Sequence, residues 1–205
     1  MQVKNPVKNP VKKPDEKILV IPKDKLFSDT PFSGLQPLDT FDKHQELIQT
    51  NQEFLWRSEM EQDTNYKQII PYLIFSHDNK LFIMQRRGDA SEARLQNKYT
   101  LGIGGHIRQE DIAGKNIFDW AQREFHEEVN YQGALTIKPI GLINDESNLV
   151  GQVHLGCAFL LTGDSGDITI KSELKDGNLR SFEECEKLYD NMETWSQIVF
   201  NYLKK

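Results

Sequence analysis

Apolar residues in the first half of the chain change their spacing as the sequence proceeds. Residues 18–21 form a short apolar run that predicts a strand. From about residue 40 to residue 61, apolar residues recur at helical spacing and predict one long helix. Residues 69–75 and 81–85 are apolar runs joined by a polar stretch, a pattern typical of a β-hairpin.

The second half continues with strands around one long helix. A strand over residues 99–103 leads into the glycine pair Gly104-Gly105. The other predicted elements are a helix over residues 117–129, strands over residues 135–143, 153–161 and 168–170, a helix opened by a capping box at residues 181–184, and a last helix over residues 195–203. Strands with one embedded helix and further helices near the ends indicate an α+β fold with a mixed sheet.

Charge and composition narrow the range of partners. The 205 residues carry a net charge of −6, and an acidic surface repels the phosphates of a nucleic-acid polymer. No apolar run approaches the length of a membrane span, and the first residues lack the apolar stretch of a secretory signal. Cys157 and Cys185 have neither disulfide nor metal-site spacing, so we expect free thiols in a reducing cytoplasm.

The first residues differ in composition from the rest of the chain. Residues 3–14 repeat a four-residue unit, Val-Lys-Asn-Pro with one lysine variant, and prolines at this period exclude a helix. A basic docking tail is one interpretation, and a solvated extension is the simpler one. We therefore expect a flexible extension over residues 1–16 and a single domain over residues 17–205, with an N-terminal addition over about 17–65.

The helix predicted over residues 117–129 carries a group of carboxylates. Glu124, Glu127 and Glu128 fall within a wedge of roughly 100°, opposite an apolar stripe. An acidic helix face is most often only a solvated surface, but three carboxylates this close repel one another unless a cation neutralises them. Hard oxygen ligands suit Mg²⁺ or Mn²⁺, which bridge protein carboxylates and substrate phosphates. The preceding glycine pair would let the backbone approach a ligand.

Together these residues resemble the signature of the Nudix hydrolase family. Gly104 and Glu110 match its first half, and the run from Arg123 to Glu128 matches its second half without exception. Residues 111–122 number twelve where the signature has seven, which resembles the lengthened box of some predicted, MutT-like phosphoesterases of the family. Asn130 stands where the signature has glycine, and we expect it to end the helix in a left-handed conformation.

The resemblance implies a Nudix-type α/β/α sandwich in which the signature forms a loop, a helix and a loop. It further implies that Glu124, Glu127 and Glu128 bind the metal, that one of them activates water, and that the carbonyl of Gly104 or Gly105 completes the metal shell. Arg123 would orient Glu127 or Glu110 by a charge-assisted bond. Further candidates are Glu110, Glu173 and, more weakly, Glu146 as an added ligand or base, and Arg86, Arg87 and, more weakly, Arg94 as phosphate-binding residues.

The predicted activity is metal-dependent hydrolysis of a diphosphate linkage in a nucleotide-like small molecule. Two alternatives stay open: a non-catalytic module that senses a ligand, and an isomerase of isoprenoid diphosphates. The first would not need three glutamates with Arg123, and the second calls for a reactive cysteine near the site. We interpret His106 and His126 as structural. The resemblance also suggests a homodimer.

Overall fold

The computed structural model describes residues 14–27, 31–37, 41–86, 97–111, 117–171 and 174–205, without the side chains of residues 41–45, 117–118 and 174–175. Its strands are β1 (Lys17–Pro22), β2 (Gly34–Pro37), β3 (Glu53–Trp56), β4 (Tyr66–His77), β5 (Lys80–Arg86), β6 (Tyr99–Thr100), β7 (Gly102–Gly104), β8 (Val129–Asn130), β9 (Leu135–Asn144), β10 (His154–Gly163), β11 (Thr169–Ile170) and β12 (Leu174–Arg180). Its helices are α1 (Lys23–Leu26), α2 (Phe41–Asn51), α3 (Arg57–Met60), α4 (Ile117–Glu128), α5 (Leu149–Val153), α6 (Phe182–Glu186) and α7 (Thr194–Leu203), with a 3₁₀ turn at Tyr189–Asn191.

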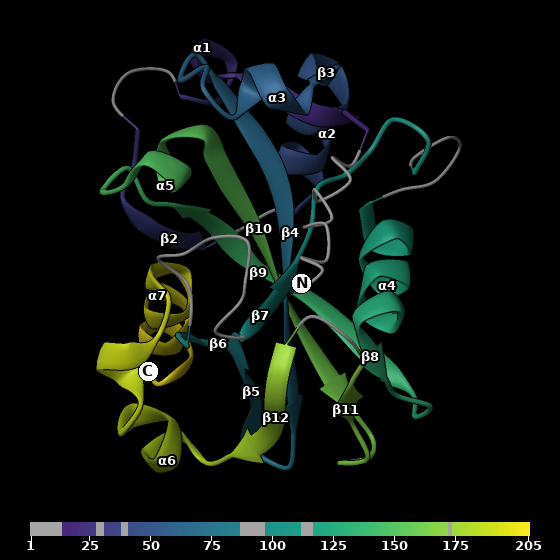
Figure 1. Ribbon diagram of the computed structural model, residues 1–205, viewed down its shortest axis with the longest axis vertical. Coiled ribbons are helices and arrows are strands. Elements are labelled where there is room, and N and C mark those ends of the chain that lie inside the picture. The colour runs from purple at the N-terminus through teal and green to yellow at the C-terminus, as the bar shows by residue number, and fades with distance from the viewer. Residues whose placement is uncertain (1–13, 28–30, 38–40, 87–96, 112–116, 172–173) are drawn as a thin grey trace, which may run out of the picture.

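A ten-stranded mixed sheet forms the centre of the molecule, as Figure 1 shows. Its main path runs β12–β5–β4–β10–β9–β2, with β1, β3, β6 and β7 paired beside it. β4 and β10 are parallel, whereas the other neighbours on the main path are antiparallel. β8 and β11 pair separately. The predicted mixed sheet is therefore confirmed.

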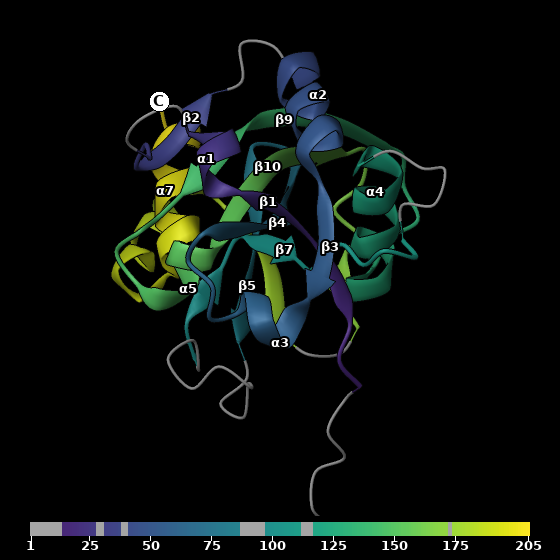
Figure 2. The same cartoon turned by 90° about the horizontal axis from the view of Figure 1, so that it is seen from above.

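Alternate residues of β4 divide the core into two layers. Leu73 and Phe75 pack with α4 residues such as Phe125 on one face of the sheet. Tyr72 and Ile74 belong to the other cluster, which includes Cys185 of α6 and Val199 and Phe200 of α7. Figure 2 shows α4 and α7 on opposite sides of the sheet. This alternation confirms the α/β/α sandwich.

The long helix predicted over residues 40–61 is wrong in its second half. α2 ends at Asn51, and residues 53–56 form β3, which pairs antiparallel with β1. Phe54 packs partly buried against the main core, while Leu55 packs against a small cluster that contains Ile18. Pairing with β3 gives the backbone groups of β1 their hydrogen-bond partners, which helical spacing alone could not reveal.

The predicted hairpin of β4 and β5 is confirmed, with a tighter turn than its polar stretch suggested. The strands extend to His77 and Lys80, so only Asp78 and Asn79 form the turn. Their φ angles are 46° and 57°. Positive φ at both central residues matches the two-residue turns that twist with their strands, and Asp and Asn tolerate this conformation.

The strand predicted over residues 99–103 is divided at Leu101. β6 pairs with β5, whereas β7 turns to pair with β4. The N–H of Leu101 donates to Ser196 Oγ at 3.0 Å, and a Cβ at Gly102 would lie 2.1 Å from Cζ of Tyr72. Glycine is therefore required where the chain crosses the Tyr72 ring, and the division brings Gly104 beside the middle of β4.

The left-handed conformation expected for Asn130 is wrong. Asn130 lies in β8, where it pairs with Thr169 of β11, and it is not among the described non-glycine residues with positive φ. The helix ends because its last residues join a strand pair: the N–H of Lys171 donates to the carbonyl of Glu128 at 2.9 Å. A partner strand more than thirty residues away decides this conformation.

Substitutions at Asn130 should follow strand preferences. We expect Asn130→Val to change the free energy of unfolding by less than about 0.5 kcal/mol, because a β-branched residue suits an exposed strand position. Asn130→Gly should cost about 0.5–1 kcal/mol through backbone entropy. Urea unfolding of both variants measures this order, and a glycine variant at least as stable as the valine variant would contradict the strand assignment.

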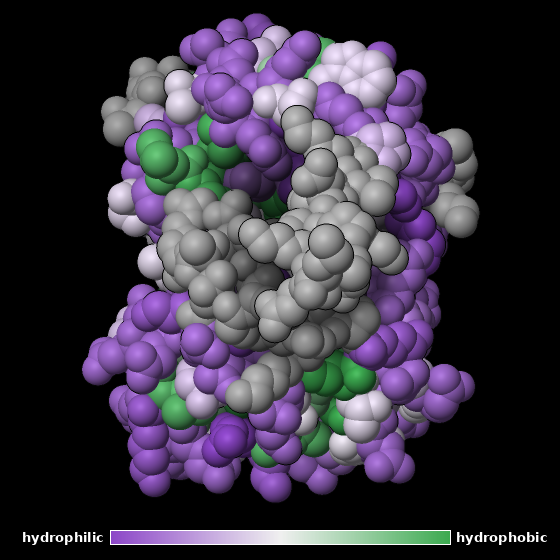
Figure 3. Space-filling view, viewed as in Figure 1, coloured by the Kyte–Doolittle hydropathy of each residue, from purple (hydrophilic) through white to green (hydrophobic). Residues whose placement is uncertain are grey.

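The face of the molecule in Figure 3 is mostly hydrophilic, with apolar residues in small patches. Among the described residues, the large apolar side chains that stay exposed are Trp56 and Leu149, at 45% and 76%. No helix in the described ranges is long and apolar enough to cross a membrane.

Candidate active site

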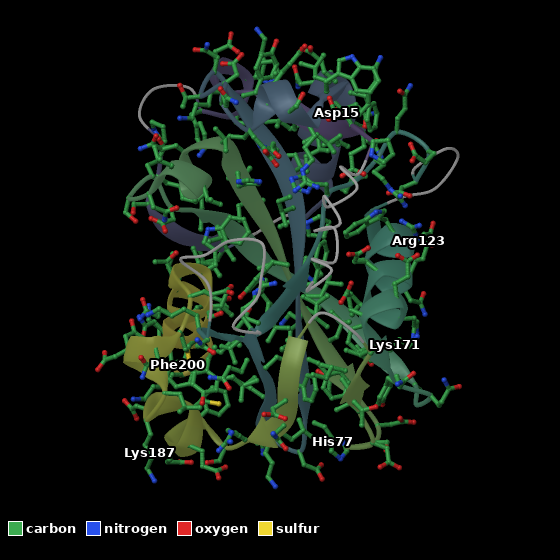
Figure 4. All side chains as sticks on the ribbon, in the orientation of Figure 1. Asp15, His77, Arg123, Lys171, Lys187 and Phe200 are labelled. Atoms are coloured by element: carbon green, nitrogen blue, oxygen red, sulfur yellow. The ribbon has the colours of Figure 1, made fainter. Side chains whose placement is uncertain are left out.

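The amphipathic pattern of α4 fixes which of its side chains can do chemistry. Ala121 and Phe125 are fully buried against the sheet, as is Val129 directly after the helix. The opposite face carries Glu124, which is half-buried, and Glu127, which is exposed. Figure 4 shows Arg123 on the side of α4 that faces away from the sheet. The structure therefore places the predicted glutamates on an accessible face of a well-anchored helix.

The glycine pair after β7 lies directly against this helix. A Cβ built on Gly105 would come within 2.4 Å of Glu124 Oε1 and 3.1 Å of Glu124 Cδ. A Cβ at Gly104 would lie 3.1 Å from the carbonyl oxygen of Pro71. Only a residue without a side chain lets the backbone approach the carboxylate this closely. The two halves of the signature thus meet at Glu124 and Gly105.

The surroundings of Glu124 disfavour its charged form. Burial and, after it, the neighbouring charges of Glu127 and Glu128 raise the pKa of its carboxyl to about 7, while Arg123 acts in the opposite direction. A carboxylate beside two others in a half-buried position is stabilised either by a proton or by a nearby cation. The electrostatics of this face therefore suit a bound cation.

This property should appear in the metal-free protein as a pH-dependent stability difference. Because the folded-state pKa of Glu124 is raised, its contribution to stability is present below its ordinary pKa of 4.5 and is lost as the pH rises through about 7. Glu124→Gln cannot ionise, so in chelator it should melt higher than the wild type at pH 8. The expected gain is on the order of 1 kcal/mol after allowance for solvent screening, or about 2–4 °C.

At pH 4.5 the gain in melting temperature from Glu124→Gln should largely disappear, because the wild-type carboxyl is then mostly protonated. Thermal melts of both proteins at the two pH values test this. An equal difference at both pH values would show that Glu124 is not electrostatically strained.

Arg123 connects the helix carboxylates to the loop before α4. Its Nη1 lies 3.3 Å from Glu127 Oε1, and its Nη2 lies 2.9 Å from Asp111 Oδ1. The sequence offered Glu127 and Glu110 as partners of Arg123, and the structure pairs Arg123 with Glu127. The carboxyl of Glu110 is 68% exposed and lies 3.7 Å from Nε of Arg108.

Asp111 is a site residue that the sequence interpretation missed. Its carboxyl is 3% exposed and accepts bonds from the Arg108 backbone N–H, the Arg108 guanidinium and the Trp120 indole, at 3.0 to 3.3 Å, in addition to the Arg123 ion pair. Burial alone would raise the pKa of Asp111, but these donors outweigh burial and hold it below its ordinary value. The available signal was the Arg108-x-x-Asp111 spacing, which allows a local ion pair.

Other predicted candidates have partners elsewhere or lie outside the described ranges. Arg86 Nε lies 2.7 Å from Glu193 Oε1, at the end of β5. Glu146 lies 2.7 Å from Lys67 Nζ and 3.0 Å from Lys23 Nζ, so ion pairs hold it away from α4. The carboxyl of Glu146 also has a pKa below its ordinary value, because these two lysines outweigh the opposing effect of burial. Outside the described ranges lie Arg87, Arg94 and Glu173.

Comparison with known proteins places the chain in a family. No protein-family model matches it. Protein YmaB of Bacillus subtilis (strain 168) is 32% identical over 204 residues, which cover 93% of this chain and 98% of YmaB. The crystal structure of Tm1382, which is assigned to the Nudix hydrolases, is 30% identical with a TM-score of 0.78, over 92% of this chain and 98% of Tm1382.

More distant structures share the fold alone. DR0079 from Deinococcus radiodurans has a TM-score of 0.53 at 14% identity, over 67% of this chain and 83% of DR0079. The Nudix domain of Shewanella oneidensis NrtR, solved in complex with ADP ribose, has a TM-score of 0.52 at 11% identity, over 67% of this chain and 86% of that domain. Because Tm1382 is 30% identical over 92% of this chain and 98% of its own, this chain belongs to the Nudix hydrolase family. It is a pyrophosphohydrolase, an enzyme that cleaves phosphoric anhydrides.

Proposed function

We propose that this enzyme hydrolyses the diphosphate linkage of a nucleotide-like small molecule and that it depends on Mg²⁺ or Mn²⁺. Glu124, Glu127 and Glu128 would hold the ion together with the backbone carbonyl of Gly105. The observation that carries the proposal is the close approach of Glu124 to the backbone of Gly105, because it brings the carboxylate face next to the glycine pair at the end of β7.

The arrangement of the carboxylates suits magnesium in particular. Within the described part of the chain, no three His, Cys, Asp or Glu side chains lie close enough together to hold a metal ion by themselves. Mg²⁺ is commonly held by one or two carboxylates, water and substrate phosphates rather than by an all-protein cage. An open carboxylate face with a raised Glu124 pKa therefore fits an ion that is shared with a diphosphate.

The residues around the carboxylates have separate roles in this proposal. When bound, the cation supplies positive charge next to the phosphate oxygens. Arg123 fixes the orientation of Glu127 through the 3.3 Å contact, and Asp111 fixes Arg123. One of the glutamates accepts a proton from the attacking water. Asp111 and Arg123 are positioning residues, because neither needs to touch the substrate.

The substrate class rests on chemistry that Nudix domains share. The NrtR domain binds ADP ribose, a molecule with a diphosphate between two ribosyl groups. Arg86 could contact a phosphate only by giving up or sharing its bond to Glu193, whereas Arg87 lies outside the described residues and stays a candidate from the sequence. A nucleoside diphosphate linked to a second group is the substrate class that we propose.

The isomerase alternative finds no support in the positions of the cysteines. Cys157 and Cys185 are buried free thiols. Burial raises the pKa of Cys157 to about 12 and that of Cys185 to about 11, so neither supplies a reactive thiolate near neutral pH. Buried free thiols are compatible with the cytoplasmic location that we propose. The homodimer, the residue 1–16 extension and the single domain over residues 17–205 stay predictions.

Metal binding and turnover test this function together. Millimolar Mg²⁺ or Mn²⁺ should raise the melting temperature, because the ion binds only the folded carboxylate face. A panel of nucleoside di- and triphosphates, nucleotide sugars, dinucleoside polyphosphates and prenyl diphosphates should contain a substrate whose turnover stops in chelator. Unchanged melting together with no turnover in the panel would contradict the proposal and favour a ligand-sensing module.

A further inference from the structure

A chain of polar side chains lies directly behind the glycine pair. His106 follows Gly105, and its Nε2 lies 2.7 Å from Oε1 of Gln68 on β4. The same nitrogen lies 3.4 Å from Nε2 of His154, the first residue of β10. Gln68 is fully buried. These three side chains come from separate segments and meet within a few residues of the proposed metal-binding face.

The outer bonds of this chain fix the position of each proton. Gln68 Nε2 donates to the carbonyl of Met60 at 3.0 Å, so Oε1 is the Gln68 atom that faces His106. His106 Nε2 must then carry the proton that it donates to Gln68. His154 Nδ1 faces the carbonyl of Val150 at 2.7 Å and must also be a donor, which leaves Nε2 of His154 as an acceptor. The single proton on His106 Nε2 points to Gln68 Oε1 at 2.7 Å and is shared only weakly with His154 Nε2 at 3.4 Å.

This assignment excludes two other roles for the histidine pair. His106 Nε2 carries a proton, so it has no lone pair for a metal ion. Both rings are neutral, because burial, together with the charges of Arg57 and His154, lowers the pKa of His106 to about 3, and burial lowers the pKa of His154. Nε2 of His106 is therefore unsuitable as a metal ligand, and neither ring is suitable as a charged proton donor.

The polar chain joins the glycine pair to two segments far from it in sequence. One end reaches Met60 in α3, and the other reaches Val150 in α5. Lys67, next to Gln68 on β4, is fully buried and donates to the carbonyl of Gly151 at 2.6 Å. The α5 segment is therefore held to β4 through Lys67 and to the glycine pair through His154.

The backbone after His106 is held from a further side. The N–H of Leu19 donates to the carbonyl of Ile107 at 2.8 Å, and the N–H of Gln109 donates to the carbonyl of Lys17 at 3.2 Å. These bonds hold residues 107–109 along β1, while the pairing of Gly104 with Tyr72 of β4 holds the backbone before Gly105. His106 is the residue between the glycine pair and residues 107–109.

We propose that Gln68, His106 and His154 form a positioning relay that holds Gly105 against Glu124 and links this geometry to the α3 and α5 segments. The effect of the relay on turnover rests on the proposed function. Its effect on the backbone after Gly105 does not, because that effect needs neither metal nor substrate. The relay requires an N–H donor at the position of His106 Nε2, because this group donates to Gln68 Oε1.

Two substitutions at one position separate this property from general packing. His106→Gln places an amide N–H close to the position of the imidazole Nε2, whereas His106→Asn reaches only as far as Nδ1. His106→Asn should therefore speed amide hydrogen exchange at Arg108 and Gln109 by at least about tenfold in the metal-free protein. In the same variant, kcat for the active panel substrate should fall and half-saturation by Mn²⁺ should weaken, each by about 10–100-fold. His106→Gln should stay within about threefold of the wild type in all three measurements.

The matched control is His77→Asn, at the other end of β4 (Figure 4). His77 Nδ1 lies 2.9 Å from the carbonyl of Gly163, and asparagine can keep a donor there. This variant should match the wild type in exchange, kcat and Mn²⁺ half-saturation. Gln68→Met keeps the shape of Gln68 but removes both of its bonds, and it should behave like His106→Asn.

Three results would overturn the relay. The first is wild-type amide exchange and kcat in His106→Asn, and the second is an equal loss of kcat in His106→Asn and His106→Gln. The third is a lower melting temperature of His106→Asn with no change in its amide exchange or kcat. A failure of the proposed function looks different, because wild-type protein would then show no metal-dependent turnover while its amide exchange still responded to His106→Asn.

Discussion

Glu124→Gln, Glu127→Gln and Glu128→Gln should each lower turnover by orders of magnitude and leave the fold intact. Each change keeps the size and helix preference of the side chain but removes one negative charge from the face of α4. If the carboxylates bind the catalytic cation, the loss appears in kcat at saturating Mg²⁺. If the carboxylates are only solvent-exposed surface groups, activity stays intact and the free energy of unfolding changes by no more than about 0.5 kcal/mol. The measurement is steady-state turnover of the purified variants with the active panel substrate.

Glu59→Gln is the matched control for these variants. Glu59 is an exposed glutamate on α3, a helix outside the proposed site, and the substitution removes the same charge. The control should keep the wild-type rate. Near-wild-type rates for Glu127→Gln and Glu128→Gln would show that the acidic face is ordinary surface, and the proposed function would have to be abandoned.

Asp111→Asn should be the most damaging change of a residue that does not contact the substrate. The substitution removes the charge that Arg108 and Arg123 share and replaces one acceptor oxygen with a donor group. We expect a loss of about 2–3 kcal/mol in the free energy of unfolding, because charge-assisted bonds to a buried carboxylate are broken while the arginines stay partly solvated. Turnover should fall by about 10–100-fold, since Glu127 loses its fixed partner.

Glu110→Gln, one residue away, is the control for Asp111→Asn. Glu110 is the acid that the family signature would select, but its carboxyl is largely exposed and only 3.7 Å from an arginine. We expect changes below about 0.5 kcal/mol and less than threefold in kcat. Urea unfolding and turnover of both variants measure the comparison. The reverse order, with Glu110→Gln more damaging, would mean that the loop holds a different acid in solution.

Local patterns in the sequence were sufficient for several elements. The apolar stripe of α4, the capping box at Ser181 and the apolar runs of the hairpin formed by β4 and β5 are properties of neighbouring residues, and all three are confirmed. The position of the glutamates opposite that stripe follows from the same periodicity. Their meeting with Gly105 followed from the family signature and not from any local pattern.

Contacts between distant segments explain what the sequence did not reveal. Residues 53–56 are apolar enough for either a helix or a strand, and β1 decides between them. Asn130 is extended because β11 pairs with it. Glu110 and Asp111 are adjacent acids, and the position of Trp120 and two arginines determines which of them turns inward. Each outcome depends on partners that only the folded chain brings together.

The bonds of Asp111 also bear on how the lengthened signature can change its length. Asp111 contacts Trp120 and Arg123 of α4, so side chains join the start of the extra segment directly to the helix that follows it. Residues between these anchors can be added or lost at a small entropic cost, about 0.6 kcal/mol for each doubling of length, without moving the catalytic helix. A family member built this way can change the length of this segment while the geometry of the α4 carboxylates stays constant. The segment between Asp111 and α4 is therefore a natural position for substrate preference to diverge among related enzymes.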